Sequence, residues 1–378
     1  MKSKLRSRKQ DGFSLVELLV VMGLFVLVLG ITSNTFTLIL RQSTQQAKQT
    51  ETQMERIVGL EMLRTDIGSA GLGLPWSFRS TINYSEAVSA SLCGGSSGIG
   101  IDPSSYNDAP SGVPRAILSG NNLCMNGSDY LIIKGTAVTT NSSSQNWSYI
   151  SYGSTAPRTW GSNDISNGDN VIVIEPQQSS TNIRQLVMNG STFSTTYSSN
   201  AFSSNFAPFN PGEVYLIYDV DPVNSLRMPF NRSDYYITTS HSLVPTYCAP
   251  NTGVLVKATV SQADGTIKNN KLPLLDCVAD MQVVYMLDTN GAGVINGESD
   301  DISGFTADQI RNQVAEVRLY ILSHEGKMDT SFTYPSSTVT VGEFGLGSMD
   351  NLSSLIGAGW QNYRWKVSTI VVKPENLL

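Results

Sequence analysis

A run of 23 residues without a charged side chain, Leu18–Leu40, constrains the fold of this chain more than any other feature. A helix needs about 20 predominantly apolar residues to cross the hydrocarbon core of a bilayer, so this run is long enough to span a membrane. Glu17 stands immediately before it. Because an ionisable side chain at the start of such a segment is costly in lipid, we interpret Glu17 as a functional residue.

The charges on either side of this run predict its orientation. Five cations precede the run and two follow soon after it: Lys2, Lys4, Arg6, Arg8 and Lys9, then Arg41 and Lys48. This asymmetry favours a leader on the cytoplasmic side, with everything after residue 40 outside the cytoplasm. The whole chain carries a formal net charge of −6. An acidic balance argues against nucleic-acid binding, which depends on a basic surface.

The helical pattern continues beyond the apolar run. Residues 41–67 contain no proline and one glycine, Gly59, and they are rich in good helix formers. Apolar residues recur at spacings of three and four, at Met54, Ile57, Val58, Leu60, Leu63 and Ile67. This spacing predicts an apolar face that packs on the chain's own head. Gly68 and Pro75 are among the residues that end the pattern, so we expect one helix from Phe13 to about Ile67.

The rest of the chain predicts strands. Three segments place glycine and an acidic residue before a short β-branched or aromatic run: Gly127–Ile133, Gly168–Ile174 and Gly212–Tyr218. In two later segments, Val314–Leu322 and Tyr363–Val372, apolar residues alternate with other residues, as expected of strands with two different faces. Asn189-Gly190 and Asp264-Gly265 predict tight hairpin turns. We expect long surface loops at Ser77–Gly112 and Thr139–Ser166, which are rich in glycine, serine and asparagine.

These patterns together predict an α+β fold, in which a long N-terminal helix, half of it transmembrane, packs on a large antiparallel β-rich head. We divide the chain into a leader (1–12), a transmembrane and assembly half of the helix (13–40), an amphipathic half (41–70) and a head (71–378).

The four cysteines predict disulfides rather than a metal site. Cys93, Cys124, Cys248 and Cys277 include no C-x-x-C pair, and the chain has two histidines, so zinc is poorly supported. Four cysteines allow three pairings. The pairs Cys93–Cys124 and Cys248–Cys277 would each close a loop of about 30 residues and stabilise by roughly 3–4 kcal/mol in the chain-entropy model. A compartment outside the cytoplasm favours disulfides over free thiols.

Gly12-Phe13-Ser14-Leu15-Val16-Glu17-Leu18-Leu19 resembles the class III signal of type IV pilins and type II secretion pseudopilins. The resemblance implies that a prepilin peptidase cuts between Gly12 and Phe13 and methylates the amine of Phe13. It also implies that Glu17 pairs with a mature N-terminal amine during filament assembly. The chemistry supports this pairing independently, because a carboxylate in lipid is costly unless it is neutralised.

A second resemblance covers short motifs further along the chain. Met62–Gly71, Cys277–Tyr285 and Tyr363–Thr369 are similar to segments of PilW-type minor pilins. This resemblance implies a subunit that helps to initiate or cap a type IV pilus. The implied partners are other minor pilins, the major pilin and the inner-membrane assembly platform. The head would lie in the periplasm before assembly and on the pilus, at its tip, afterwards. The alternatives are a type II secretion pseudopilin of the GspJ kind and an adhesin displayed at the tip.

One loop offers candidate calcium ligands. In Asp288–Glu298, the residues Asp288, Asn290 and Asn296 stand at the first, third and ninth positions of a calcium loop, with Glu298 close to the last. Ala292 at position five departs from that pattern, and an ordinary polar hairpin is the competing interpretation. Apart from a structural calcium ion at this loop, we expect no cofactor.

We find no residues that indicate an enzyme. Gly94-Gly95-Ser96-Ser97-Gly98 has the spacing of a nucleophile elbow but lies in a glycine- and serine-rich loop, without the required strand and helix. His241 and His324 have no recognisable nucleophile partner, and His324 follows an apolar strand, so we expect it at a strand end.

Overall fold

The computed structural model describes residues 14–93, 100–161, 164–176, 183–240, 242–267 and 271–377. The chain divides into two compact units, one up to Glu51 and one from Thr52 onward. Helix α1 (Leu15–Gly68) contributes to both units. Its bounds confirm the expected helix over the described residues. The boundary between the units falls inside the predicted amphipathic half of α1, so the last turns of the helix belong to the same unit as the head.

The first unit presents an apolar helix surface. By length and composition, α1 can cross a membrane over Leu15–Thr44, and none of the side chains in its most apolar window is buried. The hydroxyls of Thr32, Thr35 and Thr37 donate to the backbone carbonyls four residues earlier, at 2.7–2.9 Å. These bonds satisfy polar groups that would otherwise be costly in apolar surroundings.

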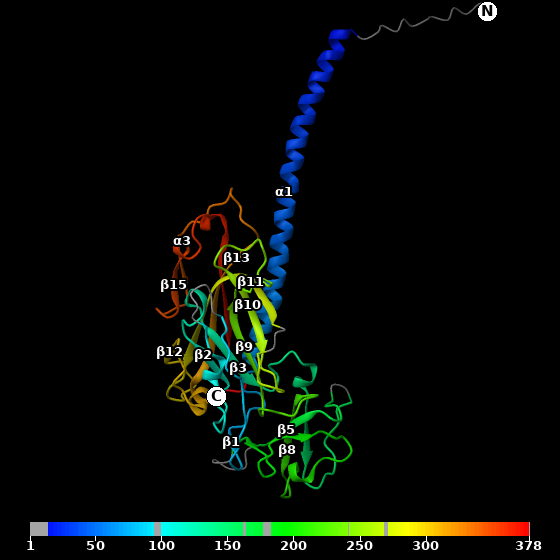
Figure 1. Ribbon diagram of the computed structural model, residues 1–378, viewed down its shortest axis with the longest axis vertical. Helices are drawn as coiled ribbons and strands as arrows, with labels where there is room; N and C mark the ends of the chain where they lie inside the picture. The colour runs from blue at the N-terminus through cyan, green and yellow to red at the C-terminus, as the bar shows by residue number, and fades with distance from the viewer. Residues whose placement is uncertain are drawn as a thin grey trace, which may run out of the picture. The chain divides into compact units, whose positions relative to one another are not determined.

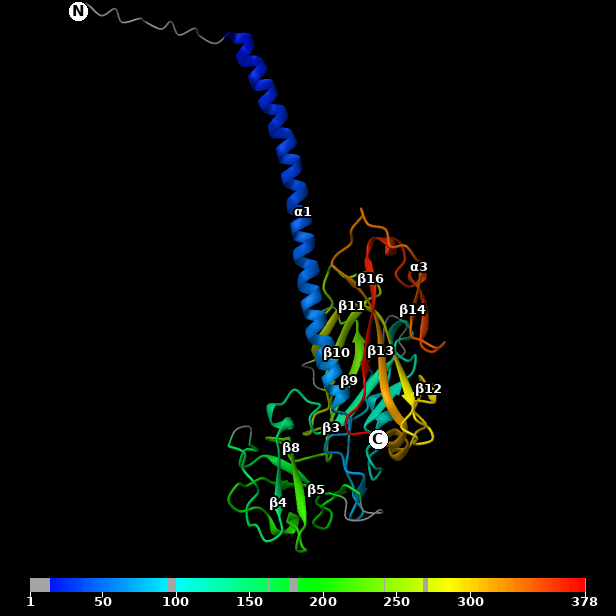
Figure 2. The ribbon, with the colours of Figure 1, turned by 180° about the vertical axis from the view of Figure 1, so that it is seen from behind.

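A large antiparallel sheet dominates the second unit (Figures 1 and 2). Its strands are, in order across the sheet, β16 (Arg364–Val372), β13 (Val314–Glu325), β11 (Leu272–Leu287), β10 (Gly253–Thr259), β9 (Asn231–Thr238), β3 (Tyr130–Gly135) and β2 (Ile117–Gly120), with β12 (Gly297–Ser299) paired to β11. Most residues of β11 and β13 are buried, because an apolar core packs on each face of the sheet at these strands.

A smaller sheet lies in the same unit, where Figure 2 labels β4, β5 and β8 together. Its strands are, in order, β1 (Ser77–Phe78), β6 (Gln185–Leu186), β5 (Asn170–Glu175), β8 (Val214–Asp221) and β4 (Trp147–Ser151), with β7 (Thr195–Thr196) paired to β5. The β1–β6 pair is parallel, and the other pairs between these strands are antiparallel.

The remaining described elements are short. They are the strand pair β14 (Thr338–Val341) and β15 (Ser348–Asn351), the helices α2 (Ala307–Gln313) and α3 (Leu352–Leu355), and the 3-10 helices Pro103–Tyr106, Met125–Gly127, Ser142–Gln145, Ser204–Phe206 and Trp360–Asn362.

Most of the predicted strands are confirmed. The three glycine-acid segments form β3, β5 and β8, and they lie in two different sheets rather than in a repeated unit. The predicted loop Thr139–Ser166 is wrong in part, because it contains β4. The sequence analysis missed this strand because it lies inside a serine-rich segment. Along the strand, Trp147, Tyr149 and Ser151 are exposed or half-buried, and they alternate with buried residues.

The large sheet separates two apolar cores. Val317, Leu319 and Ile321 of β13 enter the larger core, whereas Tyr320 and Leu322 enter a smaller one on the opposite face. This is the alternation that the sequence of β13 predicts. The larger core also contains residues of α1, so the helix is part of the packing that holds the head together.

Candidate functional site

The first turn of α1 carries Glu17, and the adjacent side chains are all apolar and exposed. Leu15 is 79% exposed and Val16 is 69% exposed, so this end of the helix displays one carboxylate on an uncovered apolar surface. The predicted cleavage and methylation residues, Gly12 and Phe13, lie outside the described residues. The same is true of His241 and of the nucleophile-elbow pattern around Ser96.

The last turns of α1 are anchored in the head by a buried charge pair that sequence reasoning missed. Leu63 and Ile67 are fully buried, and Asp66 lies on the same helix face. Its carboxylate accepts hydrogen bonds from Lys257 Nζ of β10, at 2.7 Å, and from Tyr235 OH of β9. Burial raises the pKa of the Asp66 carboxyl, and the charge of Lys257 opposes that rise. The sequence does hold a signal for this charge pair, because Asp66 stands among the apolar residues of one helix face, where an acid is seldom buried without a partner.

The head-facing stripe of α1 differs from the predicted one. Ile57 and Val58 were expected to pack on the head, but each is 66% exposed. The stripe runs instead through Arg56, Gly59, Leu60, Leu63, Asp66 and Ile67, which also recur at spacings of three and four. Arg56 Nη1 donates to Glu325 Oε1 of β13 at 2.5 Å. An ion pair and a glycine therefore occupy places where the sequence suggested aliphatic packing.

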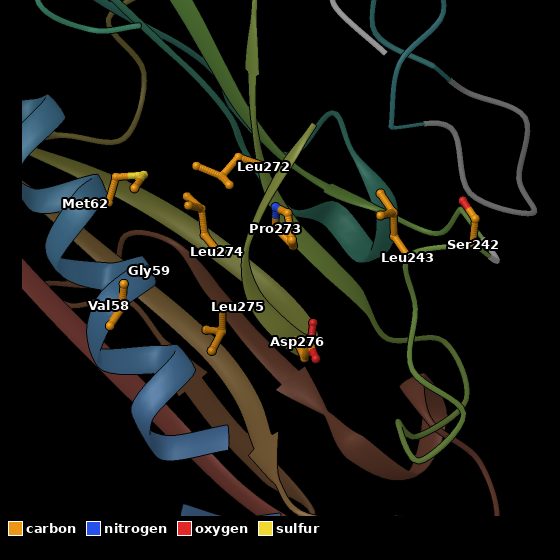
Figure 3. Close-up of a pocket in the computed structure, with 10 residues that line it drawn as sticks. All are labelled: Val58, Gly59, Met62, Ser242, Leu243, Leu272, Pro273, Leu274, Leu275 and Asp276. Carbon is orange, nitrogen blue, oxygen red and sulfur yellow. The ribbon is translucent and has the colours of Figure 1, made fainter. Parts of the chain in front are cut away.

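Gly59 allows the backbone of α1 to lie close to the backbone of the large sheet. A Cβ atom at this position would lie 1.8 Å from the backbone oxygen of Leu274 in β11, so no other residue fits without movement of the backbone. Beside this contact, Val58 and Met62 of α1 and Leu272–Leu275 of β11 line an open apolar groove (Figure 3). Leu243 lies across the groove from them.

The four cysteines pair in sequence order in the structure. Cys93 bonds to Cys124 and Cys248 bonds to Cys277, with Cα–Cα distances of 5.3 and 5.0 Å. His324 lies beside the second bridge, near the end of β13, and its Nε2 accepts a hydrogen bond from the backbone N–H of Ala249. Burial lowers the pKa of this imidazole to about 4. Among the described residues, these two cysteines and His324 are the one close set of metal-ligand side chains, and the disulfide removes both thiolates.

The candidate calcium loop connects β11 to β12 as a hairpin, with Met286 paired to Glu298. The Asp288 carboxylate accepts hydrogen bonds from the backbone N–H groups of Ala292 and Gly293, at 3.1 and 2.6 Å. Asn296 Oδ1 accepts from the N–H and the hydroxyl of Thr289. These bonds close the hairpin by themselves, and calcium binding at this loop stays a prediction.

Comparisons with known proteins bear on the N-terminal segment. Residues 7–33 match the family model of the prokaryotic N-terminal methylation motif. This match includes Gly12, Phe13 and Glu17, and it supports the resemblance to the type IV pilin superfamily.

The other comparisons add little. A type IV-like pilin from Thermus thermophilus is similar in structure, at 15% identity over 56% of this chain and 87% of that chain. The TM-score is 0.21, which is too low to show a common fold. None of the curated protein sequences that were compared with the chain matches it.

Proposed function

We propose that this chain is a minor pilin of the PilW type, which is cut between Gly12 and Phe13 and then helps to initiate or cap a type IV pilus. The observation that carries the proposal is the methylation motif over residues 7–33, which includes the start of a helix whose apolar surface is uncovered over Leu15–Thr44. A helix surface of this kind needs lipid or other helices around it.

Glu17 supplies the chemistry of assembly in this proposal. Leu18–Leu40 contains no cation that could neutralise this carboxylate inside an apolar environment. Cleavage before Phe13 would release an amine four residues upstream of Glu17. Pairing of that amine with a Glu17 carboxylate, on the same or a neighbouring subunit, would offset the cost of burying both charges. It would also fix the axial position of one helix against the next.

The second unit of the chain then serves as a rigid head. Its disulfides suit a compartment outside the cytoplasm, and the anchoring of Leu63, Asp66 and Ile67 makes the end of α1 part of that head. The proposed partners are other minor pilins, the major pilin, the assembly platform and the prepilin peptidase. The structural role requires no enzyme activity.

The test is deletion of the gene, with complementation by wild type, by Glu17→Ala and by Glu61→Ala. Glu61 is the matched control because it is an exposed acid of the same helix, paired with Arg64. We expect few or no surface filaments in the deletion strain, rescue by wild type and by the Glu61 variant, and poor rescue by Glu17→Ala. Normal filaments in the deletion strain would contradict the proposal. Loss of protein secretion with intact filaments would favour the pseudopilin alternative.

The N-terminus of the native protein provides a second test. Mass spectrometry of protein taken from the cell should find a chain that begins at methylated Phe13. A chain that retains Met1, or one that begins beyond residue 35, would contradict the proposed processing.

A further inference from the structure

The small sheet exposes aromatic side chains at one of its edges. β4 is the last strand of this sheet (Figure 2), and Ile150 on one of its faces is buried in the sheet's own core. On the opposite face, Trp147 stands across from Tyr218 of β8, which stands across from Ile172 of β5. Ile172 and Tyr218 are buried in the larger core, but that cover ends at β4. Trp147 is therefore 45% exposed, and Tyr149 is half-buried.

Trp160, from the loop that follows β4, adds a third ring to these two. Its ring centroid lies 5.1 Å from that of Trp147 and 5.9 Å from that of Tyr149. Trp160 is 46% exposed. The three side chains come from separate places in the sequence, and the fold brings them together into one surface. We call Trp147, Tyr149 and Trp160 the aromatic platform.

Hydrogen bonds hold the aromatic platform in place. The backbone N–H of Trp160 donates to Asp164 Oδ1 at 2.6 Å, and its indole Nε1–H donates to the carbonyl oxygen of Trp147 at 2.9 Å. Arg158 N–H donates to the carbonyl oxygen of Tyr149 at 2.9 Å. Because the indole N–H of Trp160 is already used, the part of this side chain left for a partner is its apolar ring. A surface that is fixed before binding loses little conformational entropy when a partner binds.

The sequence around the aromatic platform is polar but almost uncharged. Residues 139–166 contain sixteen serine, threonine, asparagine and glutamine residues and two charged residues, Arg158 and Asp164. The wider segment 136–226 contains six acids and two basic residues. Aromatic rings can also stack on the bases of single-stranded nucleic acid, but that mode of binding needs a basic groove along the phosphates. The charge balance therefore argues against anionic polymers and favours a neutral ligand.

A protein partner fits this surface less well than a smaller ligand. A protein–protein interface of ordinary size takes about 20–30 residues a side around an apolar core. Here three rings lie in a segment rich in hydroxyl and amide side chains. A ligand that matches both must combine an apolar face with a polar rim. A β-linked pyranose ring of the glucose type does so, because its oxygen substituents point outward around the ring and its two faces carry C–H groups.

We propose that the aromatic platform binds a neutral, β-linked polysaccharide, whose sugar rings stack on Trp147 and Trp160. The C–H groups of a sugar carry a small positive charge, and the face of an aromatic ring is negative, so the two attract. Ser151 continues the same face of β4, two residues after Tyr149, and offers a hydroxyl to the rim of the sugar. The inference concerns what the head recognises, and it does not depend on the proposed processing and assembly of the N-terminal segment.

The test is binding of cellohexaose and chitohexaose to the full-length chain, in a detergent without a sugar headgroup, because such a headgroup would compete. Calorimetry gives the Kd, and tryptophan fluorescence reports on the exposed indoles. We expect wild type to bind at least one of the two hexasaccharides. Trp147→Ala and Trp160→Ala should each raise Kd about tenfold. Trp160→Phe keeps an aromatic ring and should lose less affinity than Trp160→Ala.

The matched control is Phe344→Ala, because this ring is 62% exposed in the turn between β14 and β15, outside the aromatic platform. This variant should bind the hexasaccharide as wild type does. Thermal unfolding checks that each variant is folded. If Trp147→Ala does not fold, the two Trp160 variants decide the question alone, since Trp160 lies in a loop and not in a strand.

Three results would overturn the assignment: no binding of either hexasaccharide by wild type, the same Kd for wild type and Trp160→Ala, or tighter binding of an oligothymidylate than of either hexasaccharide. The first result removes the ligand class, and the second removes the aromatic platform as the site. The third would assign the rings to stacking on nucleic-acid bases instead.

Discussion

At the residue scale, Gly59 decides how closely α1 can approach the large sheet. Substitution of Gly59 by alanine would place a Cβ atom 1.8 Å from the Leu274 carbonyl oxygen, which is backbone and cannot rotate away. We expect Gly59→Ala to lower the free energy of unfolding by about 2–3 kcal/mol, even though alanine favours the helix.

The matched control for this substitution is Gly68→Ala, at the end of the same helix. Its Cβ atom would meet only Val372 Cγ1, at an ordinary 3.9 Å. Urea unfolding should find this variant as stable as wild type or slightly more so. Equal effects of the two substitutions would mean that Gly59 matters through helix propensity rather than through the contact with Leu274.

His324 predicts a pH dependence of stability. Its pKa in the folded protein is about 4, against an ordinary value of 6.5, so the unfolded state binds the proton more tightly. Its contribution is therefore fully present above pH 6.5 and is lost as the pH falls toward 4. The difference amounts to about 3 kcal/mol.

Other groups titrate in the same range, so the test compares wild type with His324→Gln, which keeps an acceptor for the Ala249 N–H but carries no titratable ring. The advantage of wild type over the variant should shrink by about 3 kcal/mol between pH 7 and pH 4 in denaturant unfolding. A difference that does not change with pH would show that His324 is not buried in its neutral form.

At the element scale, the charge pair Asp66–Lys257 holds the last turns of α1 on β10. Because both side chains are buried, Asp66→Ala would leave an unpaired ammonium and should cost about 3–5 kcal/mol. The double variant Asp66→Ala/Lys257→Met should recover much of that loss, since no charge is then left without a partner.

A double-mutant cycle measures this coupling directly. Glu61 and Arg64 provide the control pair, since they lie on the same helix but are exposed, and their coupling should stay below about 1 kcal/mol. Additive effects of the Asp66 and Lys257 substitutions would contradict the anchoring role.

At the scale of the whole molecule, the sequence predicted what depends on neighbours along the chain. The helix from residue 15 to residue 68 and the strands β3, β5, β8, β13 and β16 follow from local periodicity and turn residues. The head-facing stripe of α1 could not be predicted in this way. Arg56 meets Glu325, 269 residues later, and Asp66 meets Lys257, 191 residues later.

The division of the chain at Glu51 predicts which fragment is the stable head. A fragment that begins at Thr52 keeps Gly59, Leu63, Asp66 and Ile67, and it removes the uncovered apolar surface of Leu15–Thr44. We expect it to be soluble without detergent, monomeric and cooperatively folded. A fragment that begins at Ser69 loses two fully buried aliphatic side chains, each worth about 2–5 kcal/mol, and leaves Lys257 without its partner.

Such a loss is comparable to the whole stability of a typical domain, about 5–15 kcal/mol. The shorter fragment should therefore aggregate or melt far below the longer one. Size-exclusion chromatography and thermal unfolding of the two fragments decide the matter. If they melt at the same temperature, the last turns of α1 rest on the head without stabilising it, and the helix must be regarded as a separable stalk throughout its length.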